Sequence, residues 1–120
     1  MKKKVSPEII LNLFEIVGSE YCVAAEDGQI VFEQISSALK DNVEVVISFN
    51  NIKRLTSAFL NVAIGQLYGV YAEELIKELL RVQDISEDNL ILLKRVVDTA
   101  KLYFKDREKF NQAREKALEG

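Results

Sequence analysis

The stretch SFNNIKRLTSAFLNVAIGQLYG, Ser48 to Gly69, decides the fold of this chain. It begins at the end of a hydrophobic run and passes through a polar pair, Asn50 and Asn51. Asn tolerates left-handed backbone dihedrals, so the pair predicts a turn. Thr56 and Ser57 then open a largely apolar segment. Ser and Thr are favoured at helix N-caps, so this hydroxyl pair predicts that a helix begins here.

The run before the turn predicts a strand from Asn42 to Phe49. Its residues are apolar at nearly every position from Val45 onward. A continuous apolar run of this length is typical of a central strand that is covered on both faces. We therefore expect Val46 and Phe49 to be well buried, with the following helix packed on the sheet.

Upstream, the sequence predicts a strand, a short extended segment and a helix. The strand is expected from Ile9 to Leu13 and is broken by Gly18. The extended segment is YCVAA, residues 21–25, and the helix is EDGQIVFEQISSALK, residues 26–40, with Asp27 as its N-cap. Apolar residues recur at helical spacing on one face of that helix, which predicts a buried face made by Val31, Ile35, Ala38 and Leu39.

Downstream, the helix that begins at Ser57 is expected to extend to about Tyr71. Residues 75–82 have a helical composition, but a further strand is needed for packing, so Glu78 to Gln83 is interpreted as a strand. A last helix is capped by Ser86, with acidic residues in its first turn. Its predicted core stripe is Leu90, Leu93, Val97, Ala100 and Phe104.

This order of elements predicts an α/β sandwich in which helices flank a small β-sheet. Residues 1–105 are expected to form a single domain. The apolar face thins after Lys105, so residues 106–120 are interpreted as a charged helical C-terminal extension.

The composition is that of a globular domain and argues against a nucleic-acid-binding or membrane-spanning protein. The chain has 120 residues, of which 48% are hydrophobic and 29% charged, as in ordinary globular domains. The net charge of −3 argues against nucleic acid as a partner, because phosphate backbones require a concentrated basic face. No apolar run is long enough to span a membrane, and no signal-peptide core is present. We expect a cytoplasmic protein without a membrane partner.

Missing residue types argue against catalysis and metal binding. The chain has no histidine and one cysteine, so it cannot build a Ser-His-Asp or Cys-His catalytic site or a thiolate zinc site. No phosphate-binding glycine loop occurs either. Cys22 lies among apolar neighbours, which predicts a buried thiol. We expect no enzyme activity, no cofactor and no metal; an enzyme that uses carboxylates is the alternative.

The segment VVISFNNI followed by KRLTSAFLNVAIG resembles the STAS domain of anti-sigma factor antagonists, and more closely a STAS-like family of unknown function. The family pattern is a strand with an acidic residue near its end, a short turn, and Asp-Ser-Ser/Thr-Gly-Leu at the start of a helix. In this sequence Ser48 stands in place of the acidic residue, Thr56 in place of Asp and Phe59 in place of Gly. Ser57 retains the serine. The resemblance implies a STAS-like sandwich over roughly Ile9 to Phe104.

The resemblance also implies a regulatory protein-interaction module that is not an enzyme. In true STAS domains of anti-sigma factor antagonists the corresponding serine is phosphorylated by a partner kinase. The resemblance therefore makes Ser57 the phosphorylation candidate and a histidine-kinase-like ATPase, or another regulator, the candidate partner. A helix N-terminus favours anions, so a phosphate on Ser57 would be well placed. Alternatively, Ser57 or Thr56 is only an N-cap.

We expect partner-binding residues along the polar side of this segment. Gly65 and Gly69 are spaced so that another backbone can approach closely, either inside the fold or from a partner. A rival interpretation is an oligomerisation domain without a phosphorylation switch, for example a homodimer formed through the C-terminal extension. The expected partner-binding residues are Asn50, Asn51, Thr56, Ser57, Asn61, Gly65 and Tyr68.

Overall fold

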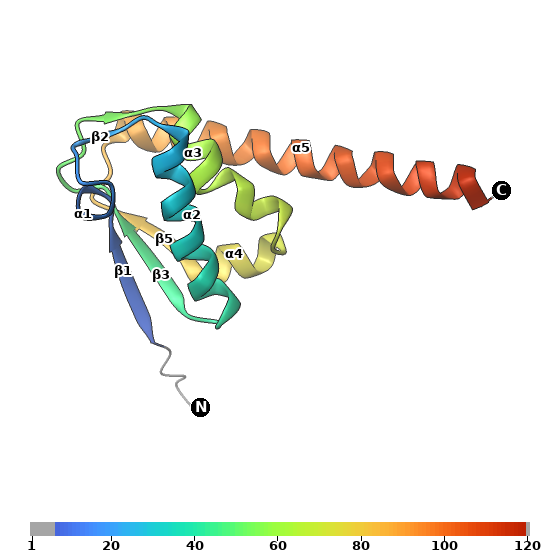
Figure 1. Cartoon of the computed structure of the whole chain (residues 1–120), viewed down its shortest axis with the longest axis horizontal. Coiled ribbons are helices and arrows are strands. Elements are labelled where there is room, and N and C mark those ends of the chain that lie inside the picture. The colour runs from blue at the N-terminus through green and yellow to red at the C-terminus, as the bar shows by residue number, and fades with distance from the viewer. Residues whose placement is uncertain (1–6, 120) are drawn as a thin grey trace.

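The computed structural model describes residues 7–119, with side chains as far as Asp106. Residues 1–6, which belong to the predicted first domain, and Gly120 of the predicted extension lie outside the described residues. The α/β architecture expected from the sequence is confirmed, with a small parallel sheet flanked by helices (Figure 1). The elements in chain order are β1 (Glu8–Asn12), α1 (Leu13–Val17), β2 (Tyr21–Cys22), α2 (Ala25–Lys40), β3 (Glu44–Ser48), β4 (Arg54–Leu55), α3 (Ser57–Ala63), the 3-10 helix η1 (Gly65–Gly69), α4 (Glu73–Leu79), β5 (Leu80–Gln83) and α5 (Glu87–Glu119).

The main sheet has the strand order β1-β3-β5, and both pairs of strands are parallel. The prediction that the apolar run forms the central strand is therefore confirmed. Val46 and Phe49 are buried, with 5% and 3% of their surfaces exposed. Because β3 hydrogen-bonds on both sides, the loop that follows it is held at the middle of the sheet's carboxyl edge.

The hydrophobic core lies on one face of this sheet. Connections between parallel strands are right-handed in nearly all proteins, so two successive crossovers in the same direction place their helices on the same face. Val45 and Ile47 belong to the core, whereas Val46 points to the opposite face and lies outside it. On that opposite face, Arg81 makes ion pairs with Glu8 and Glu44. Val46 is nevertheless only 5% exposed, so β3 is covered on both faces as expected, although the main core cluster lies on one of them.

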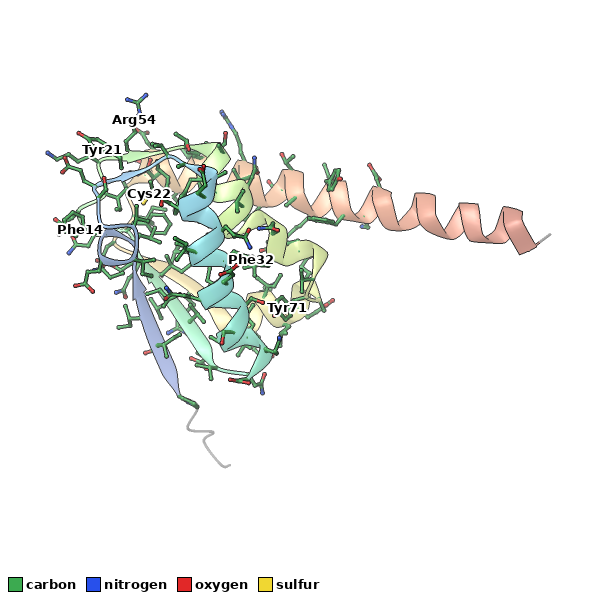
Figure 2. The ribbon with its side chains drawn as sticks, viewed as in Figure 1. Phe14, Tyr21, Cys22, Phe32, Arg54 and Tyr71 are labelled. Carbon is green, nitrogen blue, oxygen red and sulfur yellow. The ribbon has the colours of Figure 1, made fainter. Side chains whose placement is uncertain are left out.

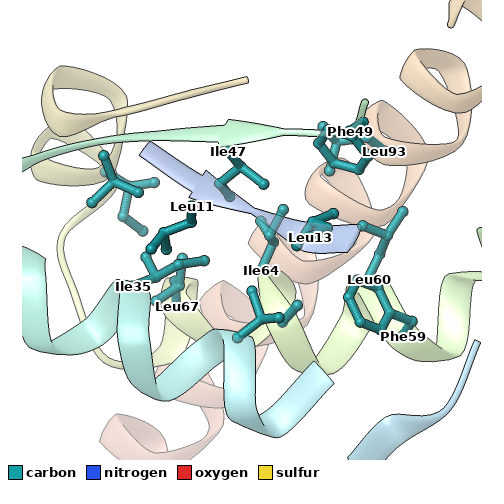
Figure 3. Close-up of a cluster of buried hydrophobic side chains, with 14 of the residues drawn as sticks. Leu11, Leu13, Ile35, Ile47, Phe49, Phe59, Leu60, Ile64, Leu67 and Leu93 are labelled. Carbon is teal, nitrogen blue, oxygen red and sulfur yellow. The ribbon is translucent and has the colours of Figure 1, made fainter. Parts of the chain in front are cut away.

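Core side chains come from the sheet and from the helices below it, as the close-up shows (Figure 3). The predicted buried face of α2 is confirmed. The labelled core residues in this view are Leu11, Leu13, Ile35, Ile47, Phe49, Phe59, Leu60, Ile64, Leu67 and Leu93.

Strand β1 ends one residue earlier than expected, because Leu13 begins the short helix α1. The Asn12 side chain accepts a hydrogen bond from the Glu15 N–H at 3.0 Å, which caps this helix. Gly18 ends it with a left-handed backbone, φ 77°, and its N–H donates to the Phe14 carbonyl at 2.9 Å. Gly18 thus terminates a helix turn where a break after a strand was expected.

Helix α2 begins at Ala25, so the prediction that Asp27 is its N-cap is wrong. Ala24 occupies the cap position without a side-chain hydrogen bond, and Asp27 lies in the first turn. Contacts with residues 54–56 hold the segment before α2 in place. Strand β2 pairs with β4, and the Thr56 hydroxyl donates a 3.0 Å hydrogen bond to the Val23 carbonyl. This pairing confirms the short extended segment at residues 21–22.

The helix that begins at Ser57 is shorter than expected. It ends at Ala63, and the 3-10 helix η1 follows, so the prediction of one helix to Tyr71 is wrong. Gly65, at the start of η1, is buried against α5: a Cβ at this position would lie 3.6 Å from the Ala100 Cβ and 3.7 Å from Val96. Packing on α5 accompanies this change of helix type, which local sequence preference does not indicate.

The ambiguous segment 75–82 contains both predicted structures. Its first part is helix α4, and strand β5 follows directly from Leu80, so the expected strand is confirmed apart from Glu78 and Leu79. The Ser86 cap is also confirmed, because the Asn89 N–H donates to its hydroxyl at 3.2 Å.

The core stripe of α5 is confirmed in part. Leu93 and Ala100 are buried as expected, and Val97 and Phe104 are half-buried. Leu90 is 46% exposed, and the prediction missed Val96, which is buried at 4%. The helix continues without a break to Glu119 and extends away from the rest of the chain (Figure 1). The C-terminal segment is therefore an extension of α5; the domain boundary at residue 105 stays a prediction.

Candidate functional site

The candidate site begins where β3 ends. Ser48 is buried, and its hydroxyl donates a 2.8 Å hydrogen bond to Asp84 Oδ2, which follows β5. The same hydroxyl accepts the Asn50 N–H at 3.3 Å. Ser48 thus joins two strand ends and the first residue of the loop. Its position in the sequence is one where the STAS pattern has an acidic residue, and the neighbouring strand supplies a carboxylate in its place.

Asp84 is the site residue that sequence reasoning missed. It comes directly after β5, with a left-handed backbone at φ 58°. Carboxyl ends of adjacent parallel strands meet at one edge of a sheet, so an acidic residue after the neighbouring strand was the available signal.

The loop after β3 makes the turn that the two Asn residues predicted. Asn51 adopts a left-handed backbone, φ 65°, and the Ile52 N–H donates to the Phe49 carbonyl at 3.2 Å. Both Asn50 and Asn51 are exposed. The turn therefore presents two amide side chains at the surface beside the sheet edge.

After the turn, the chain pairs with the segment around residue 20. The Lys53 N–H donates to the Glu20 carbonyl at 2.8 Å, and the Lys53 ammonium lies 3.6 Å from the Glu20 carboxylate. Arg54 then pairs with Tyr21 in the two-stranded ribbon β2-β4. Figure 2 shows Tyr21, Cys22 and Arg54 together at the end of the molecule that carries this ribbon. The ribbon fixes the chain immediately before α3.

Thr56 and Ser57 have separate roles. Thr56 is the N-cap of α3: its hydroxyl accepts the Phe59 N–H at 3.2 Å and donates to the Val23 carbonyl at 3.0 Å. Ser57 is the first helical residue and is exposed, and its hydroxyl makes no hydrogen bond with any residue of the described part. The expectation that one of these two hydroxyls caps the helix is therefore confirmed, and the cap is Thr56, not Ser57.

Asn61 is exposed one turn after Ser57, so these two side chains lie on the same side of α3. The predicted polar stripe does not continue beyond them as one helix face, because α3 ends at Ala63. Gly65 is buried under α5, and a Cβ on Gly69 would lie 2.4 Å from the Phe104 ring. The absence of side chains at Gly65 and Gly69 lets α5 pack closely against η1. The close backbone approach expected at these glycines therefore occurs inside the fold.

Tyr68 is half-buried between η1 and α5. The Lys101 ammonium lies 5.8 Å from the centre of its ring and pairs with the Glu73 carboxylate at 2.9 Å. Burial raises the pKa of the Tyr68 hydroxyl, which the nearby Lys101 charge partly offsets. Tyr68 is therefore part of the contact between η1 and α5.

Cys22 is fully buried, as predicted. Burial raises the pKa of its thiol to about 11, with a further contribution from the nearby Asp27 carboxylate. Residues 7–106 hold no group of three or more Cys, Asp or Glu side chains arranged to bind a metal ion. Among the described helices, none combines the length and apolar content needed to cross a membrane.

Comparison with known proteins gives one match. The family model of the STAS-like domain of unknown function (DUF4325) matches residues 27–90. No curated protein and no solved structure matches the chain. The matched residues are more than half of the chain and include β3, the loop after it, and α3. The chain belongs to the family of STAS-like domains of unknown function.

Proposed function

We propose that this chain is a non-enzymatic, cytoplasmic regulatory module that binds another protein through the loop after β3 and the start of α3. The observation that carries the proposal is the state of Ser57, which is exposed and makes no hydrogen bond within the described part of the chain, while Thr56 caps the helix. A modification of Ser57 would therefore change the docking surface without removing the cap. Asn51 and Asn61 are also exposed and extend the proposed docking surface.

In this proposal Ser57 is phosphorylated by a partner, a histidine-kinase-like ATPase. The γ-phosphoryl group of ATP passes to the Ser57 oxygen, the hydroxyl proton is released and ADP leaves. The product adds a charge of about −1.5 to −2 near neutral pH. Added charge of this size at an exposed position changes which partner surfaces can dock, because like charges placed opposite each other are repelled.

A pull-down of the native protein, read by mass spectrometry, tests both parts of the proposal. It identifies the bound protein and the phosphorylation state of Ser57 in the same sample. The affinity of that protein is then measured by calorimetry for the wild type, Ser57→Ala and Ser57→Asp. We expect Ser57→Asp to alter the affinity at least tenfold and Ser57→Ala to leave it close to that of the unphosphorylated wild type.

A matched control separates binding from folding. Thr56→Ser keeps a capping hydroxyl beside Ser57, so we expect both its stability and its affinity to match the wild type. Equal affinities for the wild type, the Ala variant and the Asp variant of residue 57 would exclude the switch. If Asn51→Ala and Asn61→Ala abolish binding but Ser57→Asp has no effect, the docking surface would be supported and the phosphorylation switch excluded.

A second candidate function is self-association through α5. The C-terminal part of α5 extends away from the other elements (Figure 1). Leu102 and Tyr103 of the same helix are 63% and 58% exposed. An isolated helical segment of this length is marginally stable in water, so packing against a second copy would stabilise it. Deleting residues 106–120 should convert a dimer to a monomer in light scattering and leave cooperative unfolding intact. A wild type that is monomeric at high concentration would exclude this candidate.

A further inference from the structure

A hollow of about 580 Å³ lies between β5 and α5, and none of its lining residues belongs to the loop after β3 or the first turn of α3. Three consecutive residues of β5, 80–82, line one side of it, and Leu93, Val97 and Lys101 of α5 line another. Neighbouring side chains of a strand point to opposite faces of a sheet. A hollow that touches residues 80, 81 and 82 together must therefore follow the edge of the strand.

This edge of β5 carries free backbone groups. In the sheet of the described residues, β5 pairs only with β3. The Gln83 carbonyl accepts the Phe49 N–H at 3.1 Å, so the backbone of Gln83 is directed toward β3. Successive residues of a strand direct their backbone groups to opposite sides, which turns the N–H and C=O of Val82 toward the hollow. Unpaired groups of this kind are a template for another strand.

The lining of the hollow combines apolar surface with positive charge. Ile64, Ile76, Leu93 and Val97 contribute apolar side chains. The charged side chains are three cations, Lys77, Arg81 and Lys101, and one carboxylate, Glu73, although the whole chain has a net charge of −3. Cations therefore outnumber carboxylates among the side chains that line the hollow.

Only one of these cations is available for a partner. Arg81 is held by Glu8 and Glu44, and Lys101 is held by Glu73. Lys77 is exposed and forms no ion pair with any residue of the described part. A carboxylate from outside the described chain would find its counter-ion at Lys77.

We propose that this hollow binds an extended segment of a partner protein, which adds a fourth strand to the sheet at β5. The segment pairs with the backbone of Val82, places apolar side chains between β5 and α5, and directs an acidic side chain at Lys77. Because β5 has four residues and every strand advances about 3.3 Å per residue, a segment of about four residues matches the edge. Symmetric pairing of two β5 edges would place a strand without any acidic residue, Leu80–Gln83, beside Lys77, which favours an acidic segment of another protein over a second copy as the occupant.

The test starts from a displayed library of random heptapeptides that is selected on the full chain. We expect the enriched peptides to alternate apolar residues and to include an acidic one. A selected peptide and its Glu→Gln form are then titrated into the labelled protein and followed by amide NMR. The Val82 amide should exchange rapidly in the free chain and become protected by the selected peptide, with at least tenfold weaker binding of the Gln form.

Two variants and one control locate the site. Val82→Pro removes the outward N–H and leaves the hydrogen bonds to β3 in place; proline is tolerated at strand edges. Lys77→Glu reverses the available charge without altering the strand, which keeps the test valid if Val82→Pro fails to fold. Each should weaken binding at least tenfold. Lys40→Glu, at the end of α2, makes the same change in net charge outside the hollow and should have no effect.

Several outcomes would overturn the proposal. One is a selection that enriches no peptide, and another is unchanged affinity in a folded Val82→Pro or in Lys77→Glu. A third is protection of the Val82 amide in the free chain that increases with protein concentration, since this would assign the edge to a second copy. Ser57→Asp should not alter peptide binding, so this test and the test of the Ser57 switch give separate answers.

Discussion

Ser48 and Asp84 join the ends of two adjacent strands through a 2.8 Å hydrogen bond from the Ser48 hydroxyl to the Asp84 carboxylate. The donor is buried and the acceptor is exposed. The bond fixes the carboxyl edge of the sheet next to the loop that carries Asn50 and Asn51. The edge therefore holds in place the loop that forms part of the proposed docking surface.

Removing the Ser48 hydroxyl should destabilise the fold modestly. Ser48→Ala deletes the donor to Asp84 and the acceptor of the Asn50 N–H, so we expect the free energy of unfolding to fall by about 1–2 kcal/mol. Asp84→Asn, the matched control, keeps an oxygen acceptor and tolerates the left-handed backbone, so its effect should be smaller. Chemical denaturation measures both. A Ser48→Ala variant as stable as the wild type would contradict the role given to this bond.

The two hydroxyls at the start of α3 should differ in their effect on stability. Thr56→Ala removes the N-cap and the bond to the Val23 carbonyl, and should lower the free energy of unfolding by about 1–2 kcal/mol. Ser57→Ala removes an exposed hydroxyl that bonds to none of the described residues, and should change the free energy of unfolding by less than about 0.5 kcal/mol. Thermal and urea unfolding of the two variants give the comparison. If Ser57→Ala lowered the free energy of unfolding more than Thr56→Ala, the assignment of Thr56 as the N-cap would be wrong.

Gly28 should tolerate a side chain poorly, because the clash would be with backbone. It packs α2 directly on α3, and an added Cβ would lie 2.7 Å from the backbone oxygen of Phe59 and 3.1 Å from the Val62 Cβ. Alanine favours a helix by about 1 kcal/mol over glycine, but this clash is with backbone and requires the helices to separate. We expect Gly28→Ala to be destabilising by about 1–3 kcal/mol.

Gly65→Ala is the matched control for Gly28→Ala. A Cβ on Gly65 meets its nearest neighbour, Ala100, at 3.6 Å, which is ordinary van der Waals contact. Its backbone suits other residues, so the change should be neutral or stabilising by up to about 1 kcal/mol. Unfolding free energies from urea titration decide the order. Equal effects of the two substitutions would show that α2 and α3 can separate at little cost.

Cys22 should make stability depend on alkaline pH. Burial raises the pKa of this thiol from about 9 to about 11 in the folded chain. Between these values the unfolded state binds fewer protons than the folded state, so the free energy of unfolding falls as the pH rises. The stabilisation from the neutral buried thiol is fully present below about pH 9 and is lost as the pH rises through 11.

The comparison for Cys22 is the pH dependence of the wild type against that of Cys22→Ala. Other groups titrate in the same range in both proteins, so their difference isolates the thiol. We expect the wild type to lose more stability than the variant between pH 9 and pH 11, as measured by urea unfolding. Alkylation of Cys22 should also be slow in the folded chain at pH 8. Parallel pH profiles would contradict the burial of the thiol.

The sequence by itself determined the order and type of most elements. The apolar run of β3, the Asn turn, the hydroxyl cap of α3 and the Ser86 cap are encoded by residues next to one another, through backbone preference and short hydrogen bonds. Local signals of this kind identify where an element begins. They also identified the family pattern around Ser57, because that pattern is continuous along the chain.

Only the tertiary structure decided which of these elements and side chains contact one another. The end of α3 at Ala63, the choice of Val96 over Leu90 for the core, and the close contact at Gly28 depend on helices distant in sequence. The same holds for the partnership of Ser48 with Asp84, which requires β3 and β5 to be neighbours. A helical or strand period fixes the face of one element, but contact between elements depends on how all of them pack around a shared core. For that reason Thr56 or Ser57 could be recognised as a cap from the sequence, and only the packed structure shows that Thr56 is the cap while Ser57 is left exposed.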